Sequence, residues 1–238
     1  MWKVIGASVA GTSHQAAGRQ CEDVCGWRAA PEMTCLAVAD GAGSRPMSRC
    51  GAALAVESAL LACADGPRAG DPAAWLRLVF GAAREQITAR ALADGNEVDD
   101  YATTLAVAIL TRAAVAVGQI GDTIAVAGRA GSYQTVAPAP RAEYVNETAF
   151  LTGPDALGEL RIDVTAAAQA DTVFLATDGL RFKILEDLAT AAPFAPFFED
   201  LATFARSSQA SDDAVRAFLA DLDDQSGDDK TLLAAVRG

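Results

Sequence analysis

The sequence predicts an α+β fold in which antiparallel sheets carry helices on their outer faces. The chain reads as strands, two helices, more strands, more helices and a last strand, without the strand–helix alternation of a parallel sheet. Several strand-length apolar runs are nearly continuous, as expected of strands that are covered on both faces. With 238 residues, 51% of them hydrophobic, the chain is predicted to form one large domain over residues 1–238.

Strand-length apolar runs occur along most of the chain, and turn residues separate them. The predicted strands cover residues 2–11, 24–27, 34–39, 104–110, 113–117, 124–127, 144–151, 160–164, 172–176 and 230–236. The second and third runs flank a short segment with Pro31, which predicts a hairpin. Residues 12–20 and 96–100 are predicted to form polar loops.

Helical spacing of apolar residues marks three further stretches. One helix is predicted to begin near Ser48 and to end at residues 65–67. A second is predicted to follow Asp71 and Pro72, because aspartate is a good N-cap and proline suits the first turn. Residues 184–222 are again helical in pattern, with interruptions at Pro193 and Pro196.

Charge and composition exclude several classes of protein. A net charge of −12 repels phosphate backbones, so we expect no nucleic-acid partner. No uncharged apolar run reaches about 18 residues and no signal peptide is evident, so we expect a cytoplasmic protein with no membrane association. The five cysteines are predicted to be reduced core residues, and Cys21-x3-Cys25 is only a weak zinc pattern without a second pair.

Carboxylates follow two buried apolar runs at the point where each run ends. Asp40-Gly41 follows residues 36–39, and Asp178-Gly179 follows residues 174–177. A single Asp-Gly pair is an ordinary turn. Two such pairs, together with the acidic pairs Glu22-Asp23 and Asp228-Asp229, indicate a site for hard cations that bind oxygen ligands.

The sequence lacks the motifs of several other catalytic mechanisms. It contains no Cys-x5-Arg, no phosphate-binding Gly-x4-Gly-Lys-Ser/Thr and no Gly-x-Ser-x-Gly, and a single histidine, His14, disfavours a catalytic triad. Carboxylate chemistry remains. Two divalent cations can lower the pKa of a shared water, which then attacks phosphorus while the cations neutralise phosphoryl charge. Asp40 is the natural bridging carboxylate, with Gly41 supplying a backbone carbonyl.

Five motifs in this order resemble those of the PPM-type (type 2C) metal-dependent protein serine/threonine phosphatases, especially the compact bacterial branch. They span almost the whole chain: Glu22-Asp23, Asp40-Gly41, Gly121-Asp122, Thr177-Asp178-Gly179 and Asp228-Asp229-Lys230-Thr231. A further match, Thr103-Thr104, is interpreted as structural. The resemblance implies a four-layer α/β/β/α sandwich of two antiparallel sheets.

The resemblance also implies roles for individual residues. Asp40 would bridge two Mg²⁺ or Mn²⁺ ions with a carbonyl from Gly41, and Asp178 and Asp228 would complete the first metal site; these three aspartates are the predicted catalytic residues. Glu22 and Asp23 would hold the second metal, directly or through water. Asp122 would hold a third, weaker metal.

Some positions depart from the family pattern. Many members carry a histidine after the first Asp-Gly, where this chain has Ala42. His14 and Arg19 are the candidates for phosphate binding, although a surface-loop histidine is the simpler interpretation of His14. Asp229 is assigned no direct metal contact. Solvated charges are expected at the remaining acidic pairs, Asp99-Asp100, Asp212-Asp213 and Asp223-Asp224.

The implied activity is hydrolysis of phosphoserine and phosphothreonine in proteins. The expected partners are a phosphorylated protein substrate and a separate serine/threonine kinase system, with the phosphatase itself a monomer and any regulatory domain on another protein. Two alternatives stay open from the sequence. One is a non-catalytic, metal-binding or interaction module on the same fold, and the other is a two-metal phosphoesterase that acts on a small molecule.

Overall fold

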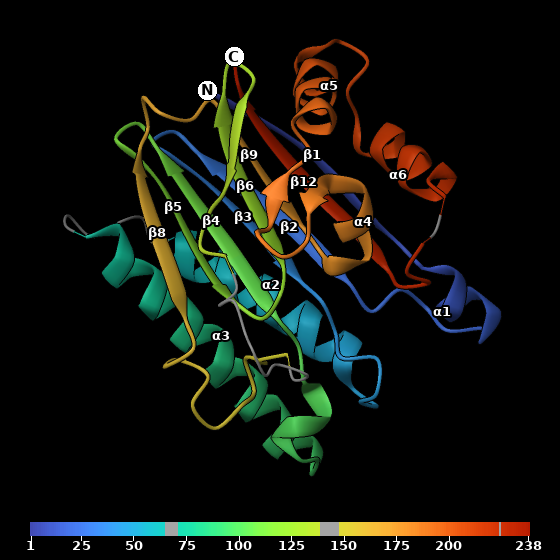
Figure 1. Ribbon diagram of the computed structural model, residues 1–238. Helices are drawn as coiled ribbons and strands as arrows, with labels where there is room; N and C mark the ends of the chain where they lie inside the picture. The colour runs from blue at the N-terminus through green and yellow to red at the C-terminus, as the bar shows by residue number, and fades with distance from the viewer. Residues whose placement is uncertain (65–70, 139–147, 224) are drawn as a thin grey trace.

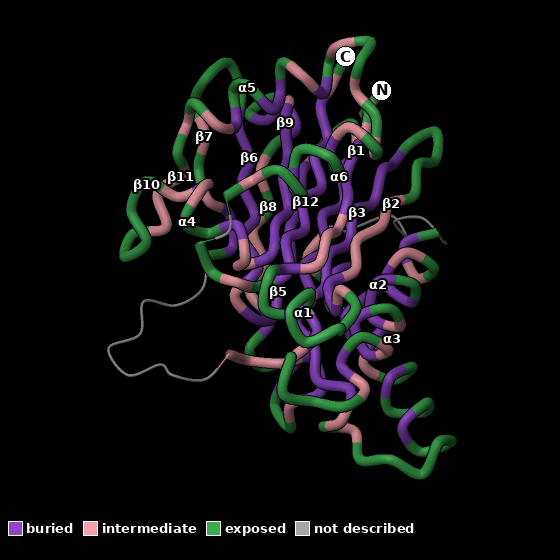
Figure 2. Tube along the Cα trace, turned by 90° about the vertical axis from the view of Figure 1, so that its right-hand side faces the viewer, coloured by how far each residue is buried: buried purple, intermediate pink, exposed green. Residues whose placement is uncertain are grey.

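Two five-stranded antiparallel sheets pack face to face in the computed structural model, which describes residues 1–64, 71–138, 148–223 and 225–238. Helices cover the outer face of each sheet (Figure 1). The result is the expected four-layer α/β/β/α sandwich. Buried residues run along the strands of both sheets, whereas the outward helix faces are exposed (Figure 2).

The first sheet has the strand order β2-β3-β4-β5-β8. Its strands are β2 (Val24–Ala30), β3 (Met33–Ala39), β4 (Leu105–Thr111), β5 (Ala114–Ile120) and β8 (Arg161–Ala166). Strand β3 is buried throughout. Cys35 and Ala37 pack in the core shared with helices α2 (Ser48–Ala64) and α3 (Pro72–Asp94), and Leu36 and Val38 pack against the other sheet. This alternation explains why β3 reads as a continuous apolar run.

The second sheet has the strand order β1-β12-β9-β6-β7. Its strands are β1 (Trp2–Val9), β12 (Lys230–Arg237), β9 (Thr172–Ala176), β6 (Ile124–Arg129) and β7 (Ser132–Thr135). The two ends of the chain meet here, because Trp2 pairs with Arg237. Helices α5 (Ala195–Arg206) and α6 (Asp212–Asp221) cover the outer face. Their apolar faces bury Phe198, Leu201 and Leu219.

Short elements connect these layers. They are α1 (Thr12–Ala16), η1 (Val98–Tyr101), η2 (Asp178–Leu180), α4 (Arg181–Ile184), β10 (Leu185–Asp187) and β11 (Ala192–Pro193). The predicted start of α3 is confirmed: the Asp71 carboxylate accepts a hydrogen bond of 2.9 Å from the Ala73 backbone N–H, and Pro72 occupies the first turn.

Four sequence-based predictions of local structure were wrong. The loop predicted at residues 96–100 contains most of the short helix η1. Within the polar loop 12–20, α1 forms without a side-chain cap, and the Ser13 N–H donates to the Gly227 carbonyl at 2.9 Å. Leu185 and Leu188 do not lie on a helix; Leu185 pairs with Pro193 in the β10–β11 hairpin. Residues 148–151 form no strand, and the rest of that prediction and the helix stop at 65–67 lie outside the described residues.

The prediction that the five cysteines are reduced core residues is only partly right, because Cys21, Cys25 and Cys50 are partly exposed. All five are free, and Cys35 and Cys63 are fully buried in the core between β3 and α2. None of the helices within the described residues has the length and apolar content needed to span a membrane.

Candidate active site

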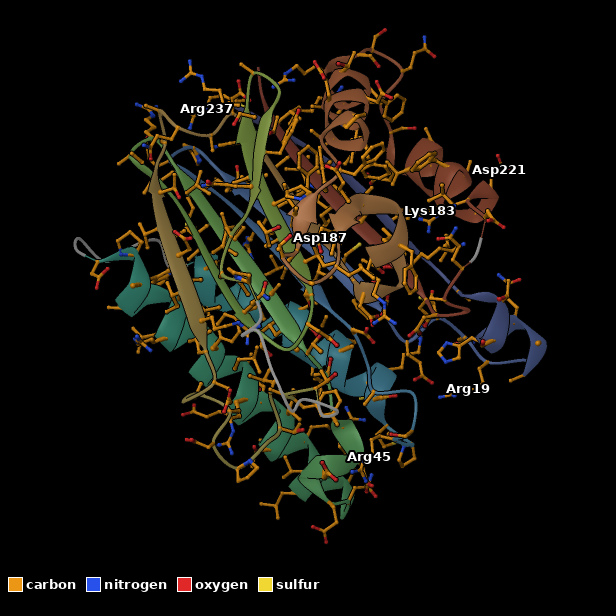
Figure 3. The ribbon with its side chains drawn as sticks, viewed as in Figure 1. Arg19, Arg45, Lys183, Asp187, Asp221 and Arg237 are labelled. Carbon is orange, nitrogen blue, oxygen red and sulfur yellow. The ribbon has the colours of Figure 1, made fainter. Side chains whose placement is uncertain are left out.

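The predicted carboxylates lie where strands of the two sheets begin and end. Asp40 directly follows β3, Asp178 follows β9 after one residue, and Asp228 precedes β12. Antiparallel pairing brings these strand ends to one edge of the sandwich. Arg19 and Arg45 also lie at the end of the molecule remote from Arg237 and the chain termini (Figure 3).

Asp40 is held through its backbone. Its N–H donates to Thr104 Oγ1 at 3.0 Å, and its carbonyl accepts from Thr103 Oγ1 and the Thr104 N–H, each at 2.9 Å. Both threonines are buried. The Thr103-Thr104 pair therefore fixes the peptide of Asp40 and leaves its carboxylate available, in line with the structural role expected for this pair.

The glycines of the two Asp-Gly pairs are required by close packing. A Cβ at Gly41 would lie 2.8 Å from the Ser48 carbonyl carbon, and one at Gly179 would lie 2.0 Å from the Asp229 carbonyl oxygen. Any larger residue would displace backbone at either position. The Asp-Gly pattern is thus explained by the packing of neighbouring chain against each turn.

Five aspartates form what we call the carboxylate cluster. Burial raises the pKa of Asp40 well above its ordinary value, and the charges of four neighbouring carboxylates add to this shift. In order of effect they are Asp23, Asp178, Asp228 and Asp122. These electrostatic contacts connect all five predicted metal-binding aspartates. Like charges held together in this way favour either protonation or a bound cation.

Asp23 has the most buried side chain of the cluster. Burial raises its pKa, while hydrogen bonds from Thr177 and Thr231 lower it. The Thr177 hydroxyl donates to Asp23 Oδ2 at 2.7 Å, whereas Asp23 Oδ1 is buried and has no hydrogen-bond partner in the part of the chain that the structure describes. A buried carboxyl oxygen without a partner is destabilising by about 1–3 kcal/mol. A divalent cation would satisfy this oxygen, so the donor chemistry of Asp23 suits a metal ligand.

Asp178 and Asp122 have further partners on the open side of the cluster. Burial raises the pKa of Asp178 and nearby Asp122 and Asp228 add to the shift, whereas Arg181 lowers it. Arg181 Nη1 lies 3.2 Å from Asp178 Oδ2. The Thr148 hydroxyl donates to Asp122 Oδ2 at 2.9 Å. Both aspartates are therefore oriented by neighbouring side chains.

Glu22 is turned toward a different set of partners. Arg19 donates to its Oε1, and the Ser48 hydroxyl donates to its Oε2 at 2.9 Å. The Arg19 guanidinium also donates to the Gly43 carbonyl at 2.8 Å. Of the acidic pair Glu22-Asp23, the structure thus places Asp23 with the carboxylate cluster, and Glu22 with Arg19 and Ser48.

His14 and Asp229 form a buried pair that was not expected from the sequence. Asp229 Oδ1 lies 2.8 Å from His14 Nδ1 and also accepts from the Gly11 N–H, and its Oδ2 accepts from the Glu22 N–H at 2.6 Å. Because Asp229 accepts in its other contacts, the geometry assigns His14 Nδ1 as the donor of this hydrogen bond and leaves Nε2 free to face Gly43. His14 is only 9% exposed, so the simpler interpretation as a surface-loop histidine was wrong.

Three side chains surround Gly43, next to Ala42. A Cβ at position 43 would lie 3.7 Å from His14 Nε2, 3.9 Å from Glu22 Oε2 and 4.0 Å from Arg19 Nη1. Both candidate phosphate-binding residues therefore lie beside the turn that follows Asp40. His14 and Asp229 lie 215 positions apart, and no spacing pattern in the sequence relates them. The motif Asp228-Asp229-Lys230-Thr231 was the only feature of the sequence that marked Asp229 as a candidate site residue.

The carboxylates are neighbours without forming a closed ligand cage. Within the described residues, no three His, Cys, Asp or Glu side chains are arranged as a group that could hold a metal ion. Mg²⁺ takes oxygen ligands at about 2.0–2.1 Å, so the clustered aspartates would have to move to coordinate it. The zinc pattern at Cys21 and Cys25 likewise gains no further ligand among these residues.

Comparisons with known proteins agree on one family. The model of the protein phosphatase 2C family matches residues 10–220. The chain is 29% identical to serine/threonine-protein phosphatase 3 of Escherichia coli strain K12 over 249 residues, covering 99% of this chain and 98% of that protein.

Solved bacterial structures share the fold at low sequence identity. The serine/threonine phosphatase Stp1 from Staphylococcus aureus superposes with a TM-score of 0.71 at 14% identity and covers 100% of this chain and 96% of that chain. The Mycobacterium tuberculosis serine/threonine phosphatase PstP/Ppp gives a TM-score of 0.66 at 18% identity, covering 99% and 98%.

Proposed function

Since the chain belongs to the protein phosphatase 2C family, we propose that it is a metal-dependent phosphatase that hydrolyses phosphoserine and phosphothreonine in proteins. The observation that supports this function most strongly is the carboxylate cluster around Asp40, with a buried oxygen on Asp23 that has no hydrogen-bond partner among the described residues. Such a cluster destabilises the metal-free fold, so its presence at one edge of the sandwich calls for a cationic ligand.

We assign the metal-holding residues as follows. Asp40 would bridge two Mg²⁺ or Mn²⁺ ions, with Gly41 adding a carbonyl, and Asp178 and Asp228 would hold the first ion. Asp23 is the stronger candidate for the second ion, because both Glu22 oxygens already accept hydrogen bonds. Asp122 would hold a third, weaker ion. When bound, the ions would supply a water of lowered pKa and neutralise charge on the phosphoryl oxygens.

Arg19 and His14 are the residues proposed to contact the phosphate. The Arg19 guanidinium offers several donors, and its contacts with Glu22 and Gly43 orient it at the turn after Asp40. Asp229 fixes the tautomer and the orientation of His14, so His14 Nε2 is presented beside Gly43. His14 thereby offers an imidazole close to Ala42, the position at which many family members carry a histidine.

The biological setting is proposed on the same basis. The substrate is a phosphoprotein and implies a separate serine/threonine kinase. We propose one catalytic domain over residues 1–238, because strands from the two chain ends pair in the same sheet, and we propose that it acts as a monomer. Five free thiols suit a reducing compartment, which supports the cytoplasm.

A phosphate-release assay tests the proposal. With Mn²⁺ the protein should hydrolyse a phosphothreonine peptide and p-nitrophenyl phosphate, and EDTA should abolish both activities. Asp40→Asn should lower kcat/KM at least about 100-fold, since even residues that only support a metal ligand change activity by about 10–100-fold. Asp99→Asn, at an exposed carboxylate paired with Arg45, is the matched control. Activity that survives EDTA and disappears on thiol alkylation would contradict the proposal.

A further inference from the structure

A mostly apolar cavity opens directly beside the carboxylate cluster. Its volume is about 320 Å³, and both Asp122 and Asp178 line it. The rest of the lining is largely apolar and includes Phe182, Leu185 and Leu188. None of these three apolar residues belongs to a motif that carries the family resemblance, so the proposed chemistry gives them no role.

Two large apolar side chains are exposed at the rim of this cavity. Phe182 is 42% exposed and Leu188 is 51% exposed. Single exposed apolar residues are normal on protein surfaces, whereas several around one concave site indicate binding. Burial of both rim residues by a ligand would remove apolar surface from water, which favours binding of an apolar group.

Hydrogen bonds hold the turn that carries Leu188, one of the two rim residues. The Asp187 carboxylate accepts from the backbone N–H groups of Ala189 and Thr190 at 2.8 and 3.2 Å, so the turn that presents Leu188 is ordered. The Phe194 N–H donates to the Ile184 carbonyl at 2.8 Å and closes the base of the hairpin. Figure 3 shows Asp187 on this hairpin. A hydrogen-bonded turn loses less conformational entropy on binding than an unrestrained one.

Arg181 connects the cavity to the carboxylate cluster. Its guanidinium lies 3.2 Å from Asp178 and 4.9 Å from the ring centre of Phe182. A ligand group in the cavity is therefore adjacent to the residues that would act on a phosphate. An extended peptide advances about 3.3–3.6 Å per residue, so a side chain within about three residues of the phosphorylated residue can reach the cavity.

We propose that this cavity is a specificity pocket for a bulky apolar side chain that neighbours the phosphorylated residue of the substrate. The substrate class is then a phosphoprotein segment with leucine or a similar residue close to its phosphoserine or phosphothreonine. An acidic neighbour is disfavoured, because it would bury no apolar surface against Phe182, Leu185 and Leu188, and because the chain has a net charge of −12. The inference rests on the proposed phosphatase function.

The test uses glycine-rich phosphothreonine peptides in which one neighbour, at each position up to three residues away, is leucine, glutamate or glycine. With Mn²⁺, the wild type should show about tenfold higher kcat/KM for leucine than for glycine at one position or more, the discrimination that a hydrophobic pocket gives for a small apolar group. Fluorescence anisotropy with non-hydrolysable phosphonate peptides should give the same preference in Kd.

A change of specificity separates a pocket role from a folding defect. Leu188→Lys should lower the preference for leucine and raise kcat/KM for the glutamate peptide relative to glycine. Leu92→Lys, on α3 at a position 81% exposed and outside the cavity lining, should keep the wild-type ratios. The inference is overturned if the wild type hydrolyses all peptides equally, or if Leu188→Lys keeps the wild-type ratios of kcat/KM as Leu92→Lys does. If the wild type hydrolyses no peptide and no p-nitrophenyl phosphate, the proposed function fails and the inference fails with it.

Discussion

Replacing Asp40 with asparagine removes one negative charge from the carboxylate cluster and leaves the backbone of residue 40 in place. The hydrogen bonds to Thr103 and Thr104 use the peptide N–H and carbonyl of Asp40 and do not involve its carboxylate. Asparagine has nearly the same shape as aspartate. The substitution therefore isolates the contribution of the charge.

Without metal, Asp40→Asn should leave stability unchanged or increase it. Like charges about 4 Å apart repel by roughly 1–4 kcal/mol, depending on the effective dielectric constant. Burial, and after it four neighbouring carboxylates, raise the pKa of Asp40, so its ionised form opposes folding. To the extent that Asp40 is already protonated, the gain is smaller. In a domain of this size each kcal/mol shifts Tm by about 2–4 °C.

With metal, the sign of the effect reverses. A cation that binds only the folded state stabilises it by RT ln(1 + [L]/Kd), about 2.7 kcal/mol at one hundred times Kd. The wild-type Tm should therefore rise by about 5–10 °C on addition of Mn²⁺. Asp40→Asn lacks the bridging carboxylate, so it should gain less than half as much.

Thermal melts of the wild type, Asp40→Asn and the control Asp99→Asn, each in EDTA and in excess Mn²⁺, measure both effects. Asp99 is exposed and pairs with Arg45, so its variant should respond to Mn²⁺ as the wild type does. If Asp40 only caps a turn, Asp40→Asn will melt several degrees early in EDTA and will gain the full Mn²⁺ shift. That pair of results would refute the metal role of Asp40.

Three further expectations concern the same site. Burial raises the folded-state pKa of Asp23 to about 8 and that of Asp178 to about 6. Their contribution to the stability of EDTA-treated protein should therefore fall as pH rises from 5 to 8, because both carboxyls bind protons more tightly when folded. A free energy of unfolding in urea that rises over this range would contradict the prediction. Asp122→Ala should lower turnover while calorimetry still detects two bound Mn²⁺ ions, and loss of a tight ion would mean that Asp122 belongs to the main site. Thr104→Val removes the acceptor for the Asp40 N–H and should lower the free energy of unfolding by about 1–3 kcal/mol, measured in urea; an unchanged value would show that this contact is dispensable.

Most of the fold follows from local patterns in the sequence. Strand β3 reads as a continuous apolar run because a helix layer and a second sheet cover its two faces. The start of α3 follows from Asp71 and Pro72, whose effects are local. In contrast, the spacing of Leu185 and Leu188 is typical of a helix, but this segment is a hairpin. Leu185 pairs with Pro193, and the Asp187 carboxylate accepts a hydrogen bond from the Ala189 N–H in the turn between the strands.

The sequence predicted the site residues that strand ends position. It did not predict those whose positions depend on contacts between distant parts of the chain. Asp40 and Asp178 end buried runs, so both sequence and structure place them at an edge of the sandwich. The helix that carries His14 has no side-chain cap of its own, and distant residues such as Asp229 hold it. Neither hydrophobic periodicity nor motif spacing in the sequence predicts such a contact.

Crystals of the protein grown with Mn²⁺, measured at the manganese absorption edge, test the central claim most directly. We expect two anomalous difference peaks roughly 3.5–4 Å apart, with one Asp40 oxygen about 2.1 Å from each and with Asp178 and Asp228 at one of them. Peaks that lie away from Asp40, or no peak at all at saturating Mn²⁺, would contradict the proposed metal centre.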